Sequence, residues 1–173
     1  MWEMDYEKAA NYWIERDAES VQMPKEALKI RISSFIAEHN TGALATSTVD
    51  GFVRNTPIEY TYVDNMLYMF SEGGLKFKCL KENKNVSLAI FDTYAGFGKL
   101  KSLQIQGVVD LVEPFTDEYL KIMEIKKIPE KGMRKLARPM SLIKVTPVCF
   151  DYLDSELKKE NYASRQHIEV LCK

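Results

Sequence analysis

The sequence predicts a mainly β protein of the α+β class, a small antiparallel barrel with helices at its ends. Three observations predict it. Two helical patterns open the chain, strand patterns fill most of residues 42–112, and turn signals such as Asp50-Gly51 join successive strands. The length of 173 residues and the hydrophobic share of 46% suit one domain with one core. We assign this domain to residues 1–154 and interpret residues 155–173 as a surface tail.

Each of the first two helices is predicted from a start signal and an apolar stripe. Asp5 suits an N-cap, and apolar residues then recur on one helical face, which predicts a helix over residues 5–16. Pro24 suits the first turn of a second helix, and its longer apolar stripe predicts a helix over residues 24–39.

The predicted strands either alternate between apolar and polar residues or form short apolar runs. In chain order they cover residues 42–49, 52–63, 66–71, 86–91, 100–112 and 142–153. A short Lys-rich helix follows the pair Gly73-Gly74, and a further helix begins after Thr116 and ends before Pro129. Strands joined by hairpins in this way form a meander, which favours a barrel.

The charge balance and the hydropathy exclude several classes of protein. Lys and Arg number 24 and Asp and Glu number 25, so the formal charge is -1 and a general nucleic-acid binder is not expected. No apolar run approaches the roughly 20 residues that cross a bilayer. The acidic, amphipathic start lacks the cationic region and the apolar stretch of a secretory signal. The odd, sparse set of three cysteines suits a reducing cytoplasm.

The histidines and cysteines are few and scattered. His39 and His167 lie far apart and have no metal-ligand spacing. The three cysteines, Cys79, Cys149 and Cys172, form no CxxC pair. We therefore expect no protein metal site, no Ser-His-Asp hydrolase and no disulfide framework. If the protein is an enzyme, its reactive group is expected to be a bound cofactor.

The most informative stretch is SEGGLKFKCLKEN, residues 71–83. Ser71 ends a strand, a glycine pair that includes Gly74 permits close approach of the backbone, and Lys76 lies in the first turn of a helix. A cation there opposes the helix dipole unless an anion is present. The hydroxyl, the free amides and the ammonium together predict a monophosphate site. The alternative is a tight turn followed by a solvated helix.

A second candidate is the strand FVRNTPIEYTYV, residues 52–63. Strand alternation places Arg54 on one face and Asn55 and Glu59 on the other. Arg54 could join the phosphate site as a fixed cationic fork. Pro57 has no N–H and leaves nearby backbone groups available to a ligand. The alternative for Glu59 is an exposed strand carboxylate.

A third candidate is LKSLQIQG, residues 100–107. Alternation places Ser102, Gln104 and Gln106 on one face of a strand. Three hydrogen-bonding side chains in a row could meet the edge of a heterocycle. They could equally form the wet side of a half-buried sheet.

Taken together, these segments resemble the flavin-binding split-barrel proteins of the pyridoxamine 5'-phosphate oxidase superfamily. The resemblance runs from about Phe35 to Asp92 and continues weakly through Leu153. Its markers are TGALATSTVDGFVRNTPIEYTYVDNMLYMFSEGGLKFKCLKENKNVSLAIFD, then QGVVDLVEP and IKVTP. The resemblance implies that the barrel is an antiparallel split β-barrel of the FMN-binding type.

The resemblance also implies a homodimer that holds FMN non-covalently in grooves between two barrels. Arg54, Ser71 and Lys76 match the phosphate-binding positions, and the backbone of residues 55–57 would run beside the isoalloxazine ring. Ser102 matches a polar position that contacts the flavin. The expected FMN-binding residues are Arg54, Asn55, Thr56, Pro57, Ser71, Gly74, Lys76, Ser102 and Gln104.

The chain departs from the true oxidases in two places. Glu59 occupies the position of a lysine that helps to hold the substrate phosphate, and the C-terminal motif of Trp and Arg has no counterpart. Both tryptophans, Trp2 and Trp13, are N-terminal. The sequence therefore resembles the flavin-reductase-like or nitroimidazole-resistance-like branches more than a vitamin B6 oxidase.

These features predict an FMN-dependent oxidoreductase that passes electrons or a hydride to a small electron-poor acceptor, with NAD(P)H as a candidate donor. No catalytic side chain is assigned. One alternative is a flavin-binding protein that stores, carries or senses flavin without turnover. Another is a protein that holds haem in the same groove, for which only His39 and His167 are candidate ligands.

Overall fold

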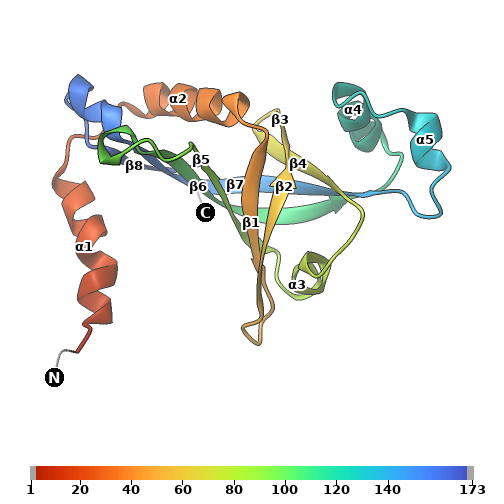
Figure 1. The fold of residues 1–173 in the computed structure, drawn as a ribbon, viewed down its shortest axis with the longest axis horizontal. Coiled ribbons are helices and arrows are strands. Elements are labelled where there is room, and N and C mark those ends of the chain that lie inside the picture. Colours follow the sequence, from red (N-terminus) through yellow and green to blue (C-terminus); the bar gives the residue numbers. More distant parts are fainter. Residues whose placement is uncertain (1–2, 171–173) are drawn as a thin grey trace.

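The computed structural model describes residues 3–170, whose strands form one antiparallel sheet that curls into a half-barrel (Figure 1). The strand order is β2-β1-β5-β6-β7-β4-β3, and β8 also pairs with β7. The strands are β1 Thr41–Ser47, β2 Val53–Glu59, β3 Thr61–Val63, β4 Met66–Ser71, β5 Asn85–Phe91, β6 Lys101–Val112, β7 Ser141–Asp154 and β8 Arg165–Glu169. The helices are α1 Tyr6–Glu19, α2 Lys25–Glu38, α3 Lys76–Glu82, α4 Asp117–Ile125 and α5 Glu130–Arg134, with 3-10 turns at Phe97–Lys99 and Ser155–Glu160. The predicted class, a split β-barrel with flanking helices, is confirmed.

The predicted elements agree with the structure to within a few residues, but one strand is divided. Asp5 caps α1, because its Oδ1 atom accepts a hydrogen bond of 2.9 Å from the N–H of Lys8. The strand predicted over residues 52–63 is two strands, since β2 pairs with β1 whereas β3 pairs with β4. Tyr60 lies between them, and its buried hydroxyl donates to the carbonyl oxygen of Ile36 at 2.8 Å. The chain therefore changes its pairing partner at Tyr60.

The inner face of the sheet carries the main core. A row of directly paired, buried residues crosses β1, β5, β6 and β7: Leu44, Leu88, Ile105 and Phe150. Helix α2 covers this core with the stripe that its sequence predicts: Leu28, Ile32, Phe35 and Ile36. Each such side chain stabilises the fold by about 1.5–3 kcal/mol when it is fully buried. The core therefore fixes which face of each strand points outward.

The pairing of β6 with β7 shifts register once. Gln106 lies opposite Cys149, whereas Gly107 lies opposite Pro147. Val148 therefore has no partner on β6 and forms a β-bulge.

Helices α4 and α5 cover a second, smaller core at the other end of the sheet (Figure 1). Its buried residues are Tyr68, Tyr119, Ile122, Met123, Met133 and Leu142. Thr116 caps α4 as predicted, since its hydroxyl accepts from the N–H of Tyr119 at 3.4 Å. The short helix α5 is an addition to the predicted elements.

The interpretation of residues 155–173 as a surface tail is wrong for residues 155–169; residues 171–173 lie outside the described part of the chain. Strand β8 pairs with β7 over five residues, and Ile168 on β8 is buried in the main core. Leu157 in the 3-10 turn is fully buried. The Oε1 atom of Gln166 accepts from the N–H of Met23 at 2.8 Å. The strand was missed because only two residues of its short alternating pattern turn inward.

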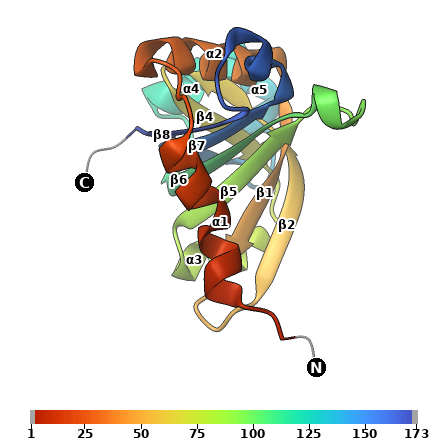
Figure 2. The same ribbon diagram turned by 90° about the vertical axis from the view of Figure 1, so that its left-hand side faces the viewer.

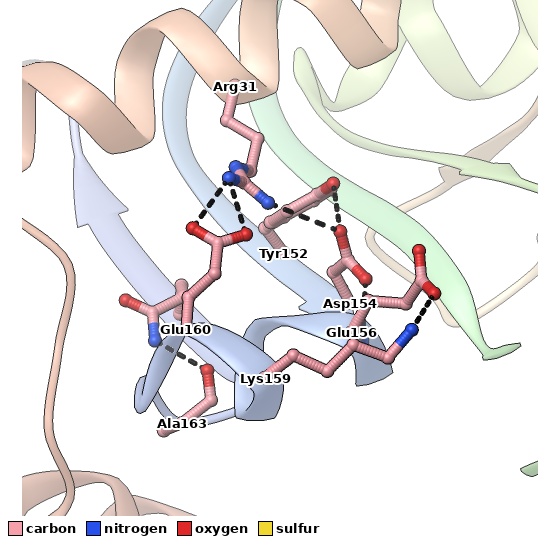
Figure 3. Close-up of polar contacts among 8 residues, drawn as sticks. Arg31, Tyr152, Asp154, Glu156, Lys159, Glu160 and Ala163 are labelled. Carbon is pink, nitrogen blue, oxygen red and sulfur yellow. Dashed lines mark hydrogen bonds and ion pairs between the residues drawn. The ribbon is translucent and has the colours of Figure 1, made fainter. Parts of the chain in front are cut away.

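A polar cluster fixes the start of this C-terminal segment to α2 (Figure 3). Arg31 on α2 contacts Glu160 at 2.8 Å and Asp154 at 3.9 Å. The hydroxyl of Tyr152 donates to Asp154 at 3.1 Å, and the N–H of Glu156 donates to the other carboxylate oxygen at 2.9 Å. Burial and then the charge of Asp154 raise the pKa of the Tyr152 hydroxyl, so the tyrosine stays a hydrogen-bond donor.

Helix α1 differs from the other long helices because none of its residues, all of them described, is buried. Figure 1 shows it apart from the sheet, and Figure 2 shows it in front of the middle of the sheet. Its contacts with the body include the Arg165 guanidinium, which lies 4.9 Å from the Trp13 ring centre. No helix within residues 3–170 is long and apolar enough to cross a membrane.

Candidate functional site

The loop between β4 and α3 is a compact polar turn. Its two glycines have φ values of +150° at Gly73 and +109° at Gly74, which L side chains rarely adopt. The Ser71 hydroxyl, itself buried, donates to the carbonyl oxygen of Gly73 at 3.2 Å, and the Lys76 ammonium donates to the same oxygen at 2.5 Å. The turn therefore holds a hydroxyl and an ammonium side by side, as the sequence predicts.

The Lys76 side chain is buried beside a second cation. Only 7% of the residue is exposed. Burial lowers the pKa of the Lys76 ammonium, and the positive charge of Arg54 on β2 lowers it further. An anion bound between the two groups would relieve both effects. Because α3 has only seven residues, this preference for an anion comes mainly from the side chains and not from the helix dipole.

A shallow, open hollow of about 560 Å³ adjoins this turn. Edge strand β2 and the β4–α3 loop form its walls, and Met140 closes one side. Five of the predicted FMN-binding residues line it: Thr56, Pro57, Ser71, Gly74 and Lys76. The structure therefore brings the two most distinctive sequence motifs, residues 52–63 and 71–83, to one place.

Ser102 and Gln104 on β6 are separated from this hollow by two strands. Pro57 lies opposite Ala43, Ala43 opposite Ala89, and Ala89 opposite Gln104. Three strand spacings amount to about 14 Å. Within one chain, the small side chains of Ala43 and Ala89 therefore lie between the hollow and these two polar residues.

Glu59 at the rim of the hollow is not a free carboxylate. One of its oxygen atoms lies 2.7 Å from the Nζ atom of Lys126, which follows α4. The position that departs from the true oxidases therefore carries an ion pair to the second core region.

The outer face of the sheet is partly apolar. Its central residues are the half-buried Ala43, Ala45, Ser87 and Ala89. Val53, Phe91 and Val108 are exposed large apolar residues on β2, β5 and β6. An open hollow of about 600 Å³ lies between Val53 and Val108 and is also lined by Ser87 and Gln106. Such a face has the composition of a surface that pairs with another protein surface.

The two histidines have different surroundings. Both ring nitrogens of His39 are engaged, one by the carbonyl oxygen of Phe35 and one by Asp92, each at 2.8 Å. His167 on β8 lies beside Asp151 and Cys149 on the outer face of β7. The sequence reasoning missed this second group, because it depends on β8. A Cys-x-Asp alternation on one strand was its only local signal.

The fold defines a split-barrel protein whose β4–α3 turn holds a hydroxyl and an ammonium beside the edge strand β2. Comparison with protein families supports the same class: the pyridoxamine 5'-phosphate oxidase family matches residues 28–152. The chain belongs to this family. Comparison with curated proteins gives no match.

Solved structures share the fold at low sequence identity. ChuZ from Campylobacter jejuni has a TM-score of 0.65 and 19% identity over 97% of this chain and 70% of its own. HutZ, the heme storage protein from Vibrio cholerae, has a TM-score of 0.58 and 19% identity over 69% of this chain and 89% of its own. A FAD-binding protein from Mesorhizobium loti has a TM-score of 0.57 and 20% identity over 70% of this chain and 89% of its own. At these identities the likeness concerns the fold alone.

Proposed function

We propose that the chain binds FMN as a homodimer and uses it as an oxidoreductase, with NAD(P)H as the donor and a small electron-poor molecule as the acceptor. The observation that carries the proposal is the buried Lys76 ammonium, held beside Arg54 and Ser71 in a turn that only glycines form easily. A phosphate monoester fits these groups, because it would accept hydrogen bonds from the ammonium, the guanidinium and the hydroxyl at once. Family membership supports the same assignment.

The chain's own part in the reaction would be to bind and orient. Arg54, Ser71 and Lys76 would hold the phosphate, and the exposed backbone of residues 55–57 would lie along the ring, because β2 is an edge strand with free polar groups. Bound FMN would supply the redox chemistry. A nearby cation would favour an anionic reduced cofactor.

A dimer is the second part of the proposal. The outer face of the sheet supports it, because Val53, Phe91 and Val108 are exposed there and apolar groups gathered on one face mark surfaces that bind another protein. A partner seated there would complete the site with its own copies of Ser102 and Gln104, which lie too far from the turn of the same chain. Sedimentation velocity should give a particle of twice the 20.0 kDa chain mass. A monomer that retains FMN would contradict this part.

Binding is tested with one matched pair of variants. Lys76→Ala should weaken FMN binding by about 1.5–3 kcal/mol, or roughly 10–150-fold, because a charge-assisted hydrogen bond to the phosphate is lost. Lys81→Ala is the control, since Lys81 is an exposed residue on the same short helix. Quenching of flavin fluorescence measures both affinities. Equal affinities would show that Lys76 does not hold the phosphate.

Turnover is tested separately from binding. Anaerobic mixing of the FMN-loaded protein with NADH or NADPH should bleach the flavin absorbance, and an electron-poor acceptor should restore it faster than with free FMN. If neither NADH nor NADPH bleaches the flavin, NAD(P)H is not the electron donor. Tight binding with no turnover above that of free FMN would favour the alternative of flavin storage, carriage or sensing.

A second candidate ligand is haem, and one observation favours it. The Nδ1 atom of His167 lies 2.8 Å from Asp151, and a carboxylate in this position orients an imidazole that ligates a metal. A solved structure with the same fold is a heme storage protein. The optical spectrum of the purified protein distinguishes the candidates: flavin maxima favour FMN, and a Soret band that His167→Ala abolishes favours haem.

A further inference from the structure

Three side chains of metal-ligand type converge on the outer face where β8 joins the sheet. Cys149 and Asp151 alternate on β7, so both point to the same face. His167 lies directly opposite Asp151, and Glu169 lies directly opposite Cys149. Two strands therefore contribute four candidate ligands to one patch.

The distances within this cluster approach those of a metal site. One ligand atom from each of Cys149, Asp151 and His167 lies within 4.8 Å of the other two. Around zinc, bonds of about 2.0–2.3 Å place tetrahedral ligand atoms roughly 3.3–3.8 Å apart. Closing the difference requires a shift of about 1 Å. Because His167 and Asp151 are both partly exposed, rotation of their side chains can provide it.

We propose that Cys149, Asp151 and His167 bind one zinc ion, with Glu169 or a water molecule as the fourth ligand. The ligand types select this metal. Thiolate, imidazole and carboxylate are the zinc donors of proteins, whereas magnesium and calcium prefer oxygen atoms alone. Glu169 is already close, since its Oε1 atom lies 3.5 Å from the Nε2 atom of His167.

The charges around the thiol suit a dication. Burial, and then the negative charges of Asp151 and Glu169, raise the pKa of Cys149, so the thiol is protonated without metal. A zinc ion would compensate the two carboxylates and displace the thiol proton to the solvent as the S–Zn bond forms. Cys149 itself is 4% exposed, so the sulfur is held in place by its surroundings.

The simpler explanation is an ion triad in which His167 is clamped between Asp151 and Glu169 without metal. The two explanations differ in one residue. The triad does not use the thiol, whereas the zinc site requires it. The haem alternative uses His167 and likewise has no need of Cys149.

The proposed zinc site is separate from the FMN turn of its own chain, although Asp151 lies directly opposite Gln104, an expected FMN-binding residue. Ser71 lies opposite Ser141 at the start of β7, and Cys149 is further along the same strand by about 26 Å, at about 3.3 Å per residue. The zinc proposal does not rest on flavin binding, so either proposal can fail alone.

The test is zinc binding to the full chain carrying Cys172→Ser, so that only the two buried, described cysteines remain. After treatment with a chelator and its removal, the protein should bind one equivalent of Zn²⁺ in competition with a chromophoric chelator. Co²⁺ in its place should give visible ligand-field bands and a near-ultraviolet thiolate-to-cobalt band. No binding of Zn²⁺, or a Co²⁺ spectrum without the thiolate band, would overturn the proposal.

Matched variants assign the ligands. Cys149→Ser should lower the Zn²⁺ affinity by at least about 10–100-fold, the scale on which even the partners of metal ligands act. Cys79→Ser, a buried cysteine on α3, is the control and should leave the affinity unchanged. Asp151→Asn, which preserves shape, should also weaken binding and covers the case in which Cys149→Ser fails to fold. If Zn²⁺ affinity is unchanged in every one of these ligand variants that folds, the proposal is overturned.

Discussion

The β4–α3 turn and the cluster on β7 and β8 are assembled in opposite ways. Ser71, Gly74 and Lys76 are neighbours in the sequence, so a short local conformation brings them together. His167 and Asp151 are 16 residues apart and meet only because β8 pairs with β7. The turn can therefore be read from a motif, whereas the cluster depends on long-range structure. Substitutions that break one region should spare the other.

The largest expected effect concerns the C-terminal segment, residues 155–169. Leu157→Ala should destabilise the protein by about 2–5 kcal/mol, because it leaves a cavity at a fully buried leucine beneath this segment. The midpoint of urea unfolding measures the loss, and Lys158→Ala, at an exposed neighbour, is the control. FMN affinity of the folded fraction should be unchanged. Weakened FMN binding would show that the two regions are coupled.

The second effect breaks the turn alone. Gly74→Ala should cost about 1–3 kcal/mol in stability, since a φ of +109° strains any residue with a Cβ atom. It should also weaken FMN binding, because relief of the backbone strain would shift the loop that positions Lys76; the new Cβ itself would only contact the Lys76 Nζ atom at 3.5 Å. Gly98→Ala is the control, because its Cβ would enter open space. Similar unfolding midpoints for Gly74→Ala and Gly98→Ala would show that an alanine at position 74 is not strained.

The third effect is electrostatic and concerns the apo turn. Arg54→Gln should raise the pKa of Lys76 part of the way to its ordinary value, because the charge of Arg54 is removed while burial, the larger cause, remains. NMR titration of the lysine Nζ resonances in FMN-free protein measures the change. Arg16→Gln on α1 should leave it unchanged. An unaltered or lower pKa would show that Arg54 does not act on this ammonium.

The smallest effect is the dependence of stability on pH at His167. Burial alone would lower the pKa of His167, but the hydrogen bond and charge of Asp151, and then of Glu169, outweigh it and raise the pKa. Because the pKa of His167 is higher in the folded state, the protonated histidine stabilises the fold. This stabilisation is complete below about pH 6.5 and is lost as the pH rises through the folded-state pKa. With exposed partners it amounts to less than about 1 kcal/mol.

The variant Asp151→Asn tests this linkage. Unfolding midpoints at about pH 6 and pH 8, measured with a metal chelator present, should differ less in the variant than in the parent. Between about pH 8 and pH 6, the free energy of unfolding should increase more for the parent protein than for Asp151→Asn. The opposite sign would mean that burial dominates at His167.

The same contrast explains what the sequence could predict. Periodicity identifies β1 and α2, because each buries one face, and the turn signals on either side identify β2. These signals do not predict the division of residues 52–63 at Tyr60, because β2 and β3 have the same alternation and only the strand with which each pairs differs. Strand β8 escapes because a five-residue alternation among charged neighbours is weak. Of the seven expected FMN residues in the two contiguous motifs, five line one hollow, whereas Arg54 and Asn55 do not. The position of Ser102 and Gln104 depends on strand order.

The bulge at Val148 decides which residues of β7 can meet a ligand at all. Before it, Ile143 and Val145 point into the main core; after it, Phe150 and Tyr152 do. Strict alternation from Val145 would instead turn Cys149 inward, so the extra residue exchanges the two faces of the strand. Deletion of Val148 would remove this extra residue, so regular alternation should then keep Cys149 outward and Phe150 and Tyr152 inward. The carbonyl oxygen of Val148 still accepts a hydrogen bond of 2.8 Å from the N–H of Val170, so the bulge costs the backbone no contact on this side. It lets one continuous strand place both Val145 and Phe150, which are five residues apart, in the core.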